Sequence, residues 1–299
     1  MTLRLRQLAP ALGVEVSGID LTGSIDEGDA AQISPAFEQF GVVVIRDQPL
    51  DVHAHARFAA RFGRLGTFRR PADRDGMVPE IFRLANTDLD GKLLPEGSDY
   101  LRTLQLNQLW HSDSSYLPIP NLGTVLRCLE VPDEGGDTIF ASMIAAFEDL
   151  PRARRESLVG LYAMHSFEYL VTSRALPALS DQDRARMPAV KQPLVRAHLD
   201  GRRSLFLSPP YMETIVGWDA GRSHAFVAEL TEWATQERYT YRHRWRPDDV
   251  VMWRNDCTLH RVTDYDMLRS PRVMHGTTLL GTHPAMPASS RDEEQSQDD

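Results

Sequence analysis

The sequence predicts a mainly β fold with inserted helices (α+β), built on a double-stranded β-helix, which is a jelly-roll core of the cupin kind. Short strand-like runs stand near both ends of the chain, and helical patterns lie between them. The strands and helices do not follow the regular βα alternation of a doubly wound parallel sheet. We therefore expect packed antiparallel sheets with helical insertions.

The first predicted elements are a strand, a helix and a second strand. Apolar and polar side chains alternate over 14–19, as in a half-buried strand. Apolar residues recur at helical spacing over 30–40, which predicts a helix with Pro35 in its first turns. Gly41 ends that helix, and the apolar run 42–46 is expected to be a short buried strand.

Capping residues predict the starts of three further helices. Asp51 begins a helix whose aromatic residues share one face. Ser142 caps a helix over 143–150, and Pro151 opens the next helix at its first position.

The C-terminal half contains a hairpin, a helix and two strands. Two apolar alternating runs within 195–208 are separated by Asp200 and Gly201, which is a strong hairpin-turn signal. Apolar residues share one face of a helix over 226–233, and strand-like runs follow at 250–253 and 273–280.

The chain is interpreted as a single domain over 1–284, because neither an internal repeat nor a linker-like stretch precedes Pro284. Residues 285–299 are expected to be a disordered acidic tail. The last eleven residues hold five acids and one Arg, and so carry −4 of the formal charge of −9. Such a composition cannot bury enough apolar surface to fold.

Composition excludes several classes of protein. With 33 Lys+Arg against 42 Asp+Glu, the chain lacks the basic footprint of a nucleic-acid binder, and no apolar run is long enough to cross a membrane. Two cysteines are too few for a disulfide framework or a Cys-rich zinc site. The N-terminus lacks the apolar core of a signal peptide, so the expected compartment is the cytoplasm. We expect a small-molecule substrate, no nucleic-acid or membrane partner, and a homo-oligomer.

Two His-x-Asp triplets are candidates for metal binding, and their contexts differ. In the triplet of His198 and Asp200 the Asp precedes Gly201, which predicts a turn. The triplet of His111 and Asp113 ends an apolar stretch. On a strand, residues two apart face the same side, so this imidazole and this carboxylate can converge on one metal. The alternative for the second triplet is a capping Asp beside a partly buried His.

A distal histidine can complete the site. His260 follows a strand and a turn, and with His111 and Asp113 it would form a two-His-one-carboxylate facial triad. This set suits Fe(II) and leaves positions open for a chelating co-substrate and dioxygen. Arg272 can clamp a carboxylate, and Thr138 offers a hydroxyl to the same anion. For Arg272 alone, the simpler alternative is a surface ion pair.

Around these residues, the chain resembles the Fe(II)/2-oxoglutarate-dependent dioxygenases of the taurine and 2,4-dichlorophenoxyacetate (TauD/TfdA) family, and most of all its aryloxyalkanoate branch. The resemblance covers nearly the whole predicted domain. The metal-binding segment is NQLWHSDSSY (107–116). The other matching segments are LGVEVSGIDL (12–21), FGVVVIRDQPL (40–50), FAARFGRLG (58–66), VPDEGGDTIFASM (131–143), YRHRWRPDDVVMWRNDCTLHR (241–261) and PRVMHGTTLLG (271–281).

The resemblance implies a role for six positions and a reaction. The implied roles are Fe(II) binding by His111, Asp113 and His260, and 2-oxoglutarate binding by Thr138, Trp253 and Arg272. The implied reaction hydroxylates a substrate C–H bond while 2-oxoglutarate and O2 yield succinate and CO2. A hydroxylated aryloxyalkanoate then collapses to a phenol and an oxo-acid, as in the catabolism of aromatic compounds. Asp113 implies hydroxylation, because related halogenases carry a small residue there.

The sequence departs from the family pattern at three places. The stretch between His260 and Arg272 is one residue longer than usual, and Arg269 is a competing clamp. The family's Trp-Asp-Asn-Arg is here Trp-Arg-Asn-Asp at 253–256, which we interpret as a swapped ion pair. The second arginine of the family's last strand, which meets the anionic group in sulfonate users, is here Gly276. This difference disfavours taurine.

Another cation must then meet an acidic substrate. The candidate cations are Lys92 and Arg70, and Asn107 is a further candidate for the substrate pocket. The alternative for the two cations is solvated loop charge. His165 and His198 are as readily structural as functional.

Three functions are compatible with these residues. The first is an oxygenase of an aryloxyalkanoate-like or other small carboxylate. The second is a hydroxylase or desaturase of an amino-acid-derived metabolite in a biosynthetic pathway. The third is a metal-binding cupin-like module without oxygenase activity, for which zinc would serve equally well. The pair of Arg272 and Thr138 argues against the third, and we expect no catalytic group beyond the metal ligands.

Overall fold

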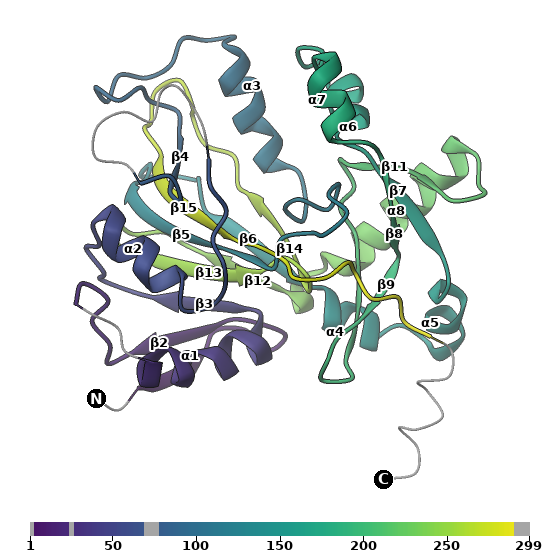
Figure 1. The fold of residues 1–299 in the computed structure, drawn as a ribbon, viewed down its shortest axis with the longest axis horizontal. Coiled ribbons are helices and arrows are strands. Elements are labelled where there is room, and N and C mark those ends of the chain that lie inside the picture. Colours follow the sequence, from purple (N-terminus) through teal and green to yellow (C-terminus); the bar gives the residue numbers. More distant parts are fainter. Residues whose placement is uncertain (1–2, 24–26, 69–77, 290–299) are drawn as a thin grey trace.

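A seven-stranded sheet forms the centre of the protein (Figure 1). The computed structural model describes residues 3–23, 27–68 and 78–289. Neighbouring strands of this sheet are antiparallel except for the parallel pair β2 and β3. The order is β1 (Arg4–Gln7), β2 (Val14–Ser17), β3 (Val42–Ile45), β13 (Val250–Arg254), β5 (Gly123–Glu130), β15 (Val273–Leu279) and β4 (Phe82–Ala85).

A three-stranded antiparallel sheet packs against one face of this large sheet. Its order is β12 (Thr240–His243), β6 (Thr138–Ser142) and β14 (Thr258–Val262). Phe140 of β6 packs with Val44, Trp253 and Met274 of the large sheet in one buried core. The ring centroids of Phe140 and Trp253 are 5.4 Å apart. This core fixes β14, which carries His260, at one edge of the smaller sheet.

Two helices cover the opposite face of the large sheet, as Figure 1 shows. Phe37 of α1 (Glu27–Phe40) and Phe58 of α2 (Val52–Ala59) pack there with Val43 and Met252. All four residues of β3 are buried, because its alternate side chains enter the two cores on either side of the sheet. A strand buried on both faces has a continuous apolar run, which is what its sequence shows.

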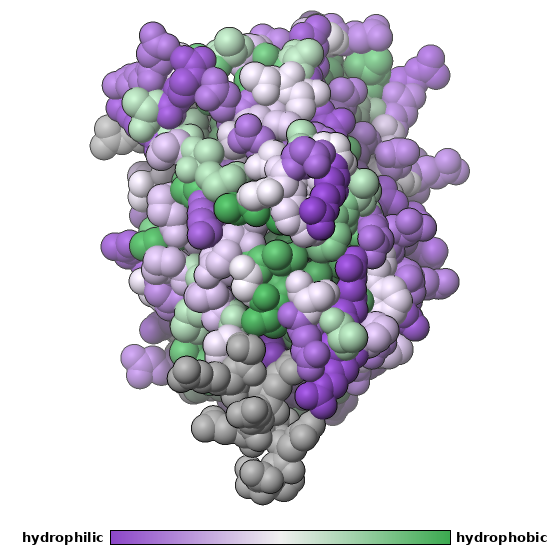
Figure 2. Space-filling model, turned by 90° about the vertical axis from the view of Figure 1, so that its right-hand side faces the viewer, coloured by the Kyte–Doolittle hydropathy of each residue, from purple (hydrophilic) through white to green (hydrophobic). Residues whose placement is uncertain are grey.

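A second group of helices and small sheets packs around a core of its own. In that core Phe226 and Leu230 lie beside Phe147 and Leu205. Figure 2 shows the outer side of this region, where a hydrophobic strip is bordered by hydrophilic residues. The elements are α4 (Met143–Glu148), α5 (Arg152–Leu158), α6 (Phe167–Ser173), α7 (Asp181–Arg186), α8 (Ala220–Ala234), η2 (Glu237–Tyr239), the sheet β11 (Met212–Ile215), β7 (Tyr162–His165) and β8 (Val190–Pro193), and the hairpin β9 (Val195–Ala197) and β10 (Arg203–Leu205).

Most of the predicted caps and turns match the structure, and the exceptions concern Pro35 and Pro151. The side chain of Asp51 accepts a hydrogen bond from the N–H of Ala54 and begins α2, and Ser142 begins α4 in the same way. Gly41 follows α1 with a φ of +69°. The placement of Pro35 in the first turns is wrong, because α1 begins at Glu27 and the proline lies in its interior. Acidic residues in the first turn favour that earlier start.

Pro151 immediately precedes α5 instead of being its first helical residue. The packed chain extends beyond the boundary predicted at residue 284. Ala285 and Ala288 are buried, and the N–H of Ala288 donates to the carbonyl of Val195 at 3.1 Å. Residues 290–299 of the predicted tail lie outside the described residues. None of the helices within the described ranges combines the length and the apolar character that a membrane span requires.

Candidate metal centre

His111, Asp113 and His260 come together at the edge of the smaller sheet. The backbones of His111 and His260 form an antiparallel bridge, with N–H···O distances of 3.0 and 2.9 Å. The possible ligand atoms of the three side chains all lie within 4.8 Å of one another. The Asp113 Oδ1 atom is 3.7 Å from the Nε2 atom of each histidine. The structure thus joins a local triplet to a histidine almost 150 residues away in the chain.

Hydrogen bonds orient two of these side chains. The Nδ1 atom of His111 lies 2.7 Å from the carbonyl oxygen of Leu109. Because a carbonyl only accepts, Nδ1 carries the proton and Nε2 keeps its lone pair. The Thr124 hydroxyl, on β5, donates to the Oδ2 atom of Asp113 at 2.8 Å. That bond leaves the Oδ1 atom of Asp113 facing the histidines.

The protonation states of the triad suit a divalent cation. Burial acts to raise the pKa of Asp113, but the nearby His260 and His111 and the bond from Thr124 outweigh it and leave the pKa below its ordinary value. Burial, and then the charge of His111, lowers the pKa of His260 to about 3. An ionised carboxylate beside a neutral imidazole is the form that binds metal. The donor set therefore fits Fe(II).

Arg272 is a buried cation with unmet hydrogen-bonding capacity. It is 4% exposed, and its Nε donates to the carbonyl of Gly136 at 2.9 Å. One terminal guanidinium nitrogen is buried without a partner, and Arg272 has no ion pair with any residue that the structure describes. Burial lowers its pKa. A buried guanidinium without a carboxylate favours a ligand that supplies one.

Thr138 and Trp253 connect this cation with the triad. Thr138 begins β6 two residues after Gly136, and its hydroxyl oxygen accepts from the indole N–H of Trp245 at 2.9 Å, which leaves the hydroxyl proton free to donate. In the β6–β14 ladder Thr138 lies opposite Val262. The ring of Trp253 is 4.9 Å from the ring of His260. Trp253 therefore packs beside His260, while Thr138 lies two residues from the carbonyl that accepts from Arg272.

The competing arginine has a different position. The Arg269 side chain is 87% exposed, and its Nε lies 3.8 Å from the Asp266 carboxylate. The geometry thus favours Arg272 as the cation inside the protein.

Gly276, which differs from the arginine expected in the family, lies where β15 passes close to β4. A Cβ atom at this position would lie 2.4 Å from the Cζ atom of Phe82 and 2.9 Å from a methyl carbon of Leu126. Apolar side chains therefore fill the space that a larger residue would need.

The predicted substrate residues are distributed differently. Asn107 lies in η1 (Leu106–Gln108), which follows α3 (Asp99–Gln105), and it is half-buried four residues before His111. Lys92 is exposed in the loop after β4. Arg70 lies outside the described residues.

Asp200, His165 and His198 have surroundings typical of structural residues. Asp200 forms the hairpin turn and pairs with Arg202 at 2.7 Å, as its turn signal predicts. His165 is fully buried, has no hydrogen-bond partner within the described part of the chain, and its ring stacks on Phe206. His198 lies 3.5 Å from the carboxylate of Asp256.

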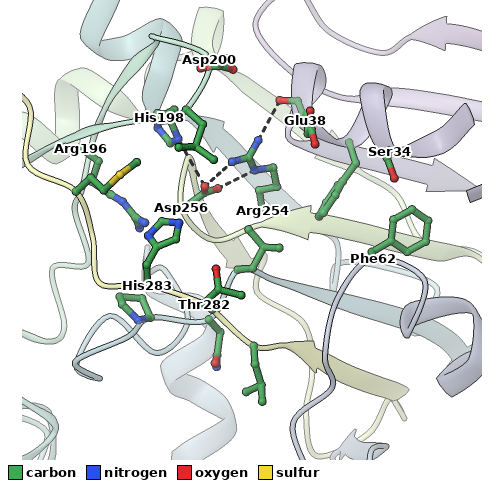
Figure 3. A pocket seen from close by; sticks show the side chains of 18 of the residues that line it. Ser34, Glu38, Phe62, Arg196, His198, Asp200, Arg254, Asp256, Thr282 and His283 are labelled. Carbon is green, nitrogen blue, oxygen red and sulfur yellow. Dashed lines mark hydrogen bonds and ion pairs between the residues drawn. The ribbon is translucent and has the colours of Figure 1, made fainter. Parts of the chain in front are cut away.

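The swapped ion pair at 253–256 is present. Arg254 makes two hydrogen bonds to Asp256, and these two residues and His198 lie in the wall of a cavity of about 560 Å³ (Figure 3). His111, Asp113 and His260 are not among the residues that line this cavity. It is therefore a different space from the triad.

Sequence reasoning missed an aromatic cluster beside the triad. The ring of Tyr116 is 4.9 Å from Phe167 and 4.8 Å from Tyr211. Burial, and then the charge of Asp113, raises the pKa of Tyr116 to about 12. Tyr116 follows Asp113 by only three residues, a signal that was present in the sequence. Nothing in the sequence brings Phe167 and Tyr211 to it.

Comparisons with known proteins find relatives that match along most of the chain. The model of the taurine catabolism dioxygenase TauD, TfdA family matches residues 4–278. An alpha-ketoglutarate-dependent 2,4-dichlorophenoxyacetate dioxygenase of Cupriavidus pinatubonensis is 35% identical over 286 residues, 93% of this chain and 98% of that protein. An (S)-phenoxypropionate/alpha-ketoglutarate-dioxygenase of Delftia acidovorans is 30% identical over 94% of this chain and 96% of its own. The crystal structure of AAD-2 in complex with Mn(II) and N-oxalylglycine matches with a TM-score of 0.87, at 32% identity over 96% of this chain and all of that one.

Proposed function

The chain belongs to the TauD/TfdA family of dioxygenases, and on that basis we propose that it is an Fe(II)- and 2-oxoglutarate-dependent dioxygenase. Its substrate would be a small carboxylate of the aryloxyalkanoate type. The observation that carries this proposal is the presence of both a His-Asp-His cluster and a buried arginine that has no anionic partner among the described residues. A metal and a carboxylate co-substrate satisfy both features at once.

The fold and domain organisation are proposed to follow the same family. The seven-stranded and three-stranded sheets, packed over a shared apolar core, support a double-stranded β-helix with helical insertions. A single domain, with an acidic tail after its last packed residues, is proposed for the chain.

The residues of the site have separate tasks. His111, Asp113 and His260 would hold Fe(II) through Nε2, Oδ1 and Nε2. When bound, Fe(II) supplies the activation of O2, so that 2-oxoglutarate, O2 and the substrate yield succinate, CO2 and a hydroxylated product. Arg272 would bind the distal carboxylate of 2-oxoglutarate through its unmet donors, and the free hydroxyl proton of Thr138 would add a hydrogen bond.

The aromatic cluster supports an aryl-bearing substrate. Tyr116, three residues after Asp113, packs with Phe167 and Tyr211, and such rings can contact a flat aromatic group. The apolar contact of Gly276 with Phe82 supports a substrate that is not bound by an arginine at that position. Lys92, Asn107 and Arg70 remain the proposed substrate residues. A metal-only module is less well supported, because it gives Arg272 no anion.

The proposal is tested by assaying the protein with Fe(II), 2-oxoglutarate and O2 against aryloxyalkanoates, sulfonates and amino-acid derivatives. We expect 2,4-dichlorophenoxyacetate or a close analogue to yield one succinate per phenol released, with the oxo-acid as second product. Succinate formation only with amino-acid derivatives would favour the biosynthetic alternative. The absence of succinate with every substrate, including uncoupled turnover, would contradict oxygenase activity altogether.

A further inference from the structure

We infer that Asn86 is a positioning residue that determines which arginine occupies the co-substrate pocket. This inference rests on the proposed function, because it assigns Asn86 a task toward the binding of 2-oxoglutarate. Asn86 directly follows β4 and is fully buried. It touches no metal-ligand candidate, so its effect would reach the reaction through Arg272.

The side chain of Asn86 connects three points of one loop. Its Oδ1 accepts from the backbone N–H of Arg272 at 2.7 Å. Its Nδ2 donates to the carbonyls of Met267 and Ser270, both at 2.8 Å. All the hydrogen-bonding capacity of this amide group except one acceptor lone pair is therefore used within residues 267–272.

These three bonds surround Arg269 and set the direction of Arg272. Met267 and Ser270 stand on either side of Arg269, whose side chain is 87% exposed and pairs with Asp266. The bond to the N–H of Arg272 fixes the backbone where β15 is about to begin. From that point the Arg272 side chain reaches the carbonyl of Gly136 in the protein interior.

The backbone of Asn86 also closes a second loop. Its carbonyl accepts from the N–H of Leu94 at 2.9 Å, and its N–H donates to the carbonyl of Arg272 at 3.3 Å. The loop over 86–94 carries Lys92, one of the candidate cations for the substrate. A single buried residue thus joins the loop before the co-substrate arginine to the loop that presents Lys92.

The test is a binding experiment on the full chain. 2-Oxoglutarate is titrated without oxygen into the Mn(II)-loaded wild type, Asn86→Ala and Asn86→Asp, and Mn(II) affinity is measured separately. Asn86→Asp keeps the acceptor for Arg272 but replaces the two donors with an oxygen that repels both carbonyls. We expect the Kd for 2-oxoglutarate to rise about tenfold or more in both variants, because buried carbonyls lose their partners and release the loop. Mn(II) affinity is expected to stay within about twofold, since the triad lies on other segments.

Gln48 provides a matched control. It is another buried amide whose side chain links three backbone groups, at Leu21, Ile19 and Arg46, but its bonds reach none of the site residues. Gln48→Ala is expected to lower thermal stability as Asn86→Ala does, while its Kd for 2-oxoglutarate stays at the wild-type value. Hydrogen exchange of the Arg272 amide is expected to accelerate in Asn86→Ala, which removes its acceptor, and to stay unchanged in Gln48→Ala.

The possible outcomes separate the two proposals. If the wild type itself does not bind 2-oxoglutarate, the proposed function fails. If the wild type binds and the Asn86 variants bind equally well, the assignment of Asn86 is overturned. An equal loss of affinity in Gln48→Ala would also overturn it, because general destabilisation would then suffice. If Asn86→Ala does not fold, the Kd of Asn86→Asp for 2-oxoglutarate gives the same decision, because this variant loses the two bonds to Met267 and Ser270.

Discussion

At the scale of single residues, two aspartates that follow a histidine by two positions have different surroundings. Asp200 closes a hairpin turn and pairs with Arg202. Asp113 faces two imidazoles and is oriented by Thr124. The Gly after Asp200 identified its turn in advance. The role of Asp113 required a partner from β14, which no local pattern supplies.

We predict that Asp113→Ala abolishes coupled hydroxylation and weakens Mn(II) binding by at least about tenfold, because it removes the only anionic ligand of the triad. Asp200→Ala is the control, and it is expected to keep both activity and metal affinity. Metal affinity is measured by calorimetry, and coupling by the ratio of succinate to product. Near wild-type activity in Asp113→Ala would contradict the ligand assignment.

The choice between Arg269 and Arg272 also belongs to this scale. The two residues lie three positions apart and are both arginines. In the sequence, only the matching segment at 271–281 favoured Arg272. Burial of one and exposure of the other separates them physically. The co-substrate pocket is thus defined by the path of one loop and not by a difference in residue type.

At the scale of elements, the pairing of β15 with β4 shapes the site next to Arg272. Gly276 stands opposite Phe82 in that ladder, and the phenyl ring lies over the glycine. A strand glycine often marks such a close approach. The sequence revealed that a glycine stands where the family pattern has an arginine. It did not reveal that an aromatic ring fills the space beside this glycine.

We predict that Gly276→Ala lowers the free energy of unfolding by about 1–3 kcal/mol, because the added methyl group overlaps Phe82 and Leu126. Phe82→Leu in the same chain is expected to recover part of this loss. Gly23→Ala is the control, since no atom of the described residues lies within 4 Å of its Cβ position, and it is expected to change stability little. Urea unfolding at constant pH measures all four proteins. Equal midpoints for Gly276→Ala and the wild type would show that β15 shifts to make room.

At the scale of the whole molecule, buried histidines connect stability with pH. Burial lowers the pKa of His165 from the ordinary value of 6.5 to about 3. Burial also lowers the pKa of His55 to about 3, although a hydrogen bond to Val125 acts in the opposite direction. The folded protein therefore keeps both rings neutral at a pH where the unfolded chain binds protons. Their stabilising effect is complete above pH 6.5 and is lost as the pH falls from 6.5 towards 3.

We predict that the metal-free protein loses up to about 1.4 kcal/mol of stability per pH unit for each of these histidines below pH 6.5. His165→Phe removes one titrating ring from a site with no polar contact, so its loss of stability between pH 7 and pH 5 is expected to be smaller. Urea midpoints at both pH values measure the difference. The same pH dependence in the variant and the wild type would contradict the assigned burial effect.

The sequence by itself determined the local elements and the family. Caps at Asp51 and Ser142, the glycine after α1 and the turn at Asp200 act over a few residues, so their signals lie within the segments they control. The long motifs also predicted the candidate metal ligands and Arg272. Pro35 was misplaced, because the acidic first turn of α1 lies upstream of the apolar pattern.

Side-chain orientation, exposure and ring contacts between distant segments could be seen only in the tertiary structure. In the folded structure Thr124 orients Asp113, and the Arg269 side chain is exposed. Asn86 is buried beneath the loop before Arg272, and Tyr211 contacts Tyr116. Each of these is a hydrogen bond, an exposure or a ring contact between strands and loops far apart in the chain. The physical reason is that burial and hydrogen-bond geometry are properties of packed neighbours, and a residue's neighbours are fixed only when the sheets close over their shared core.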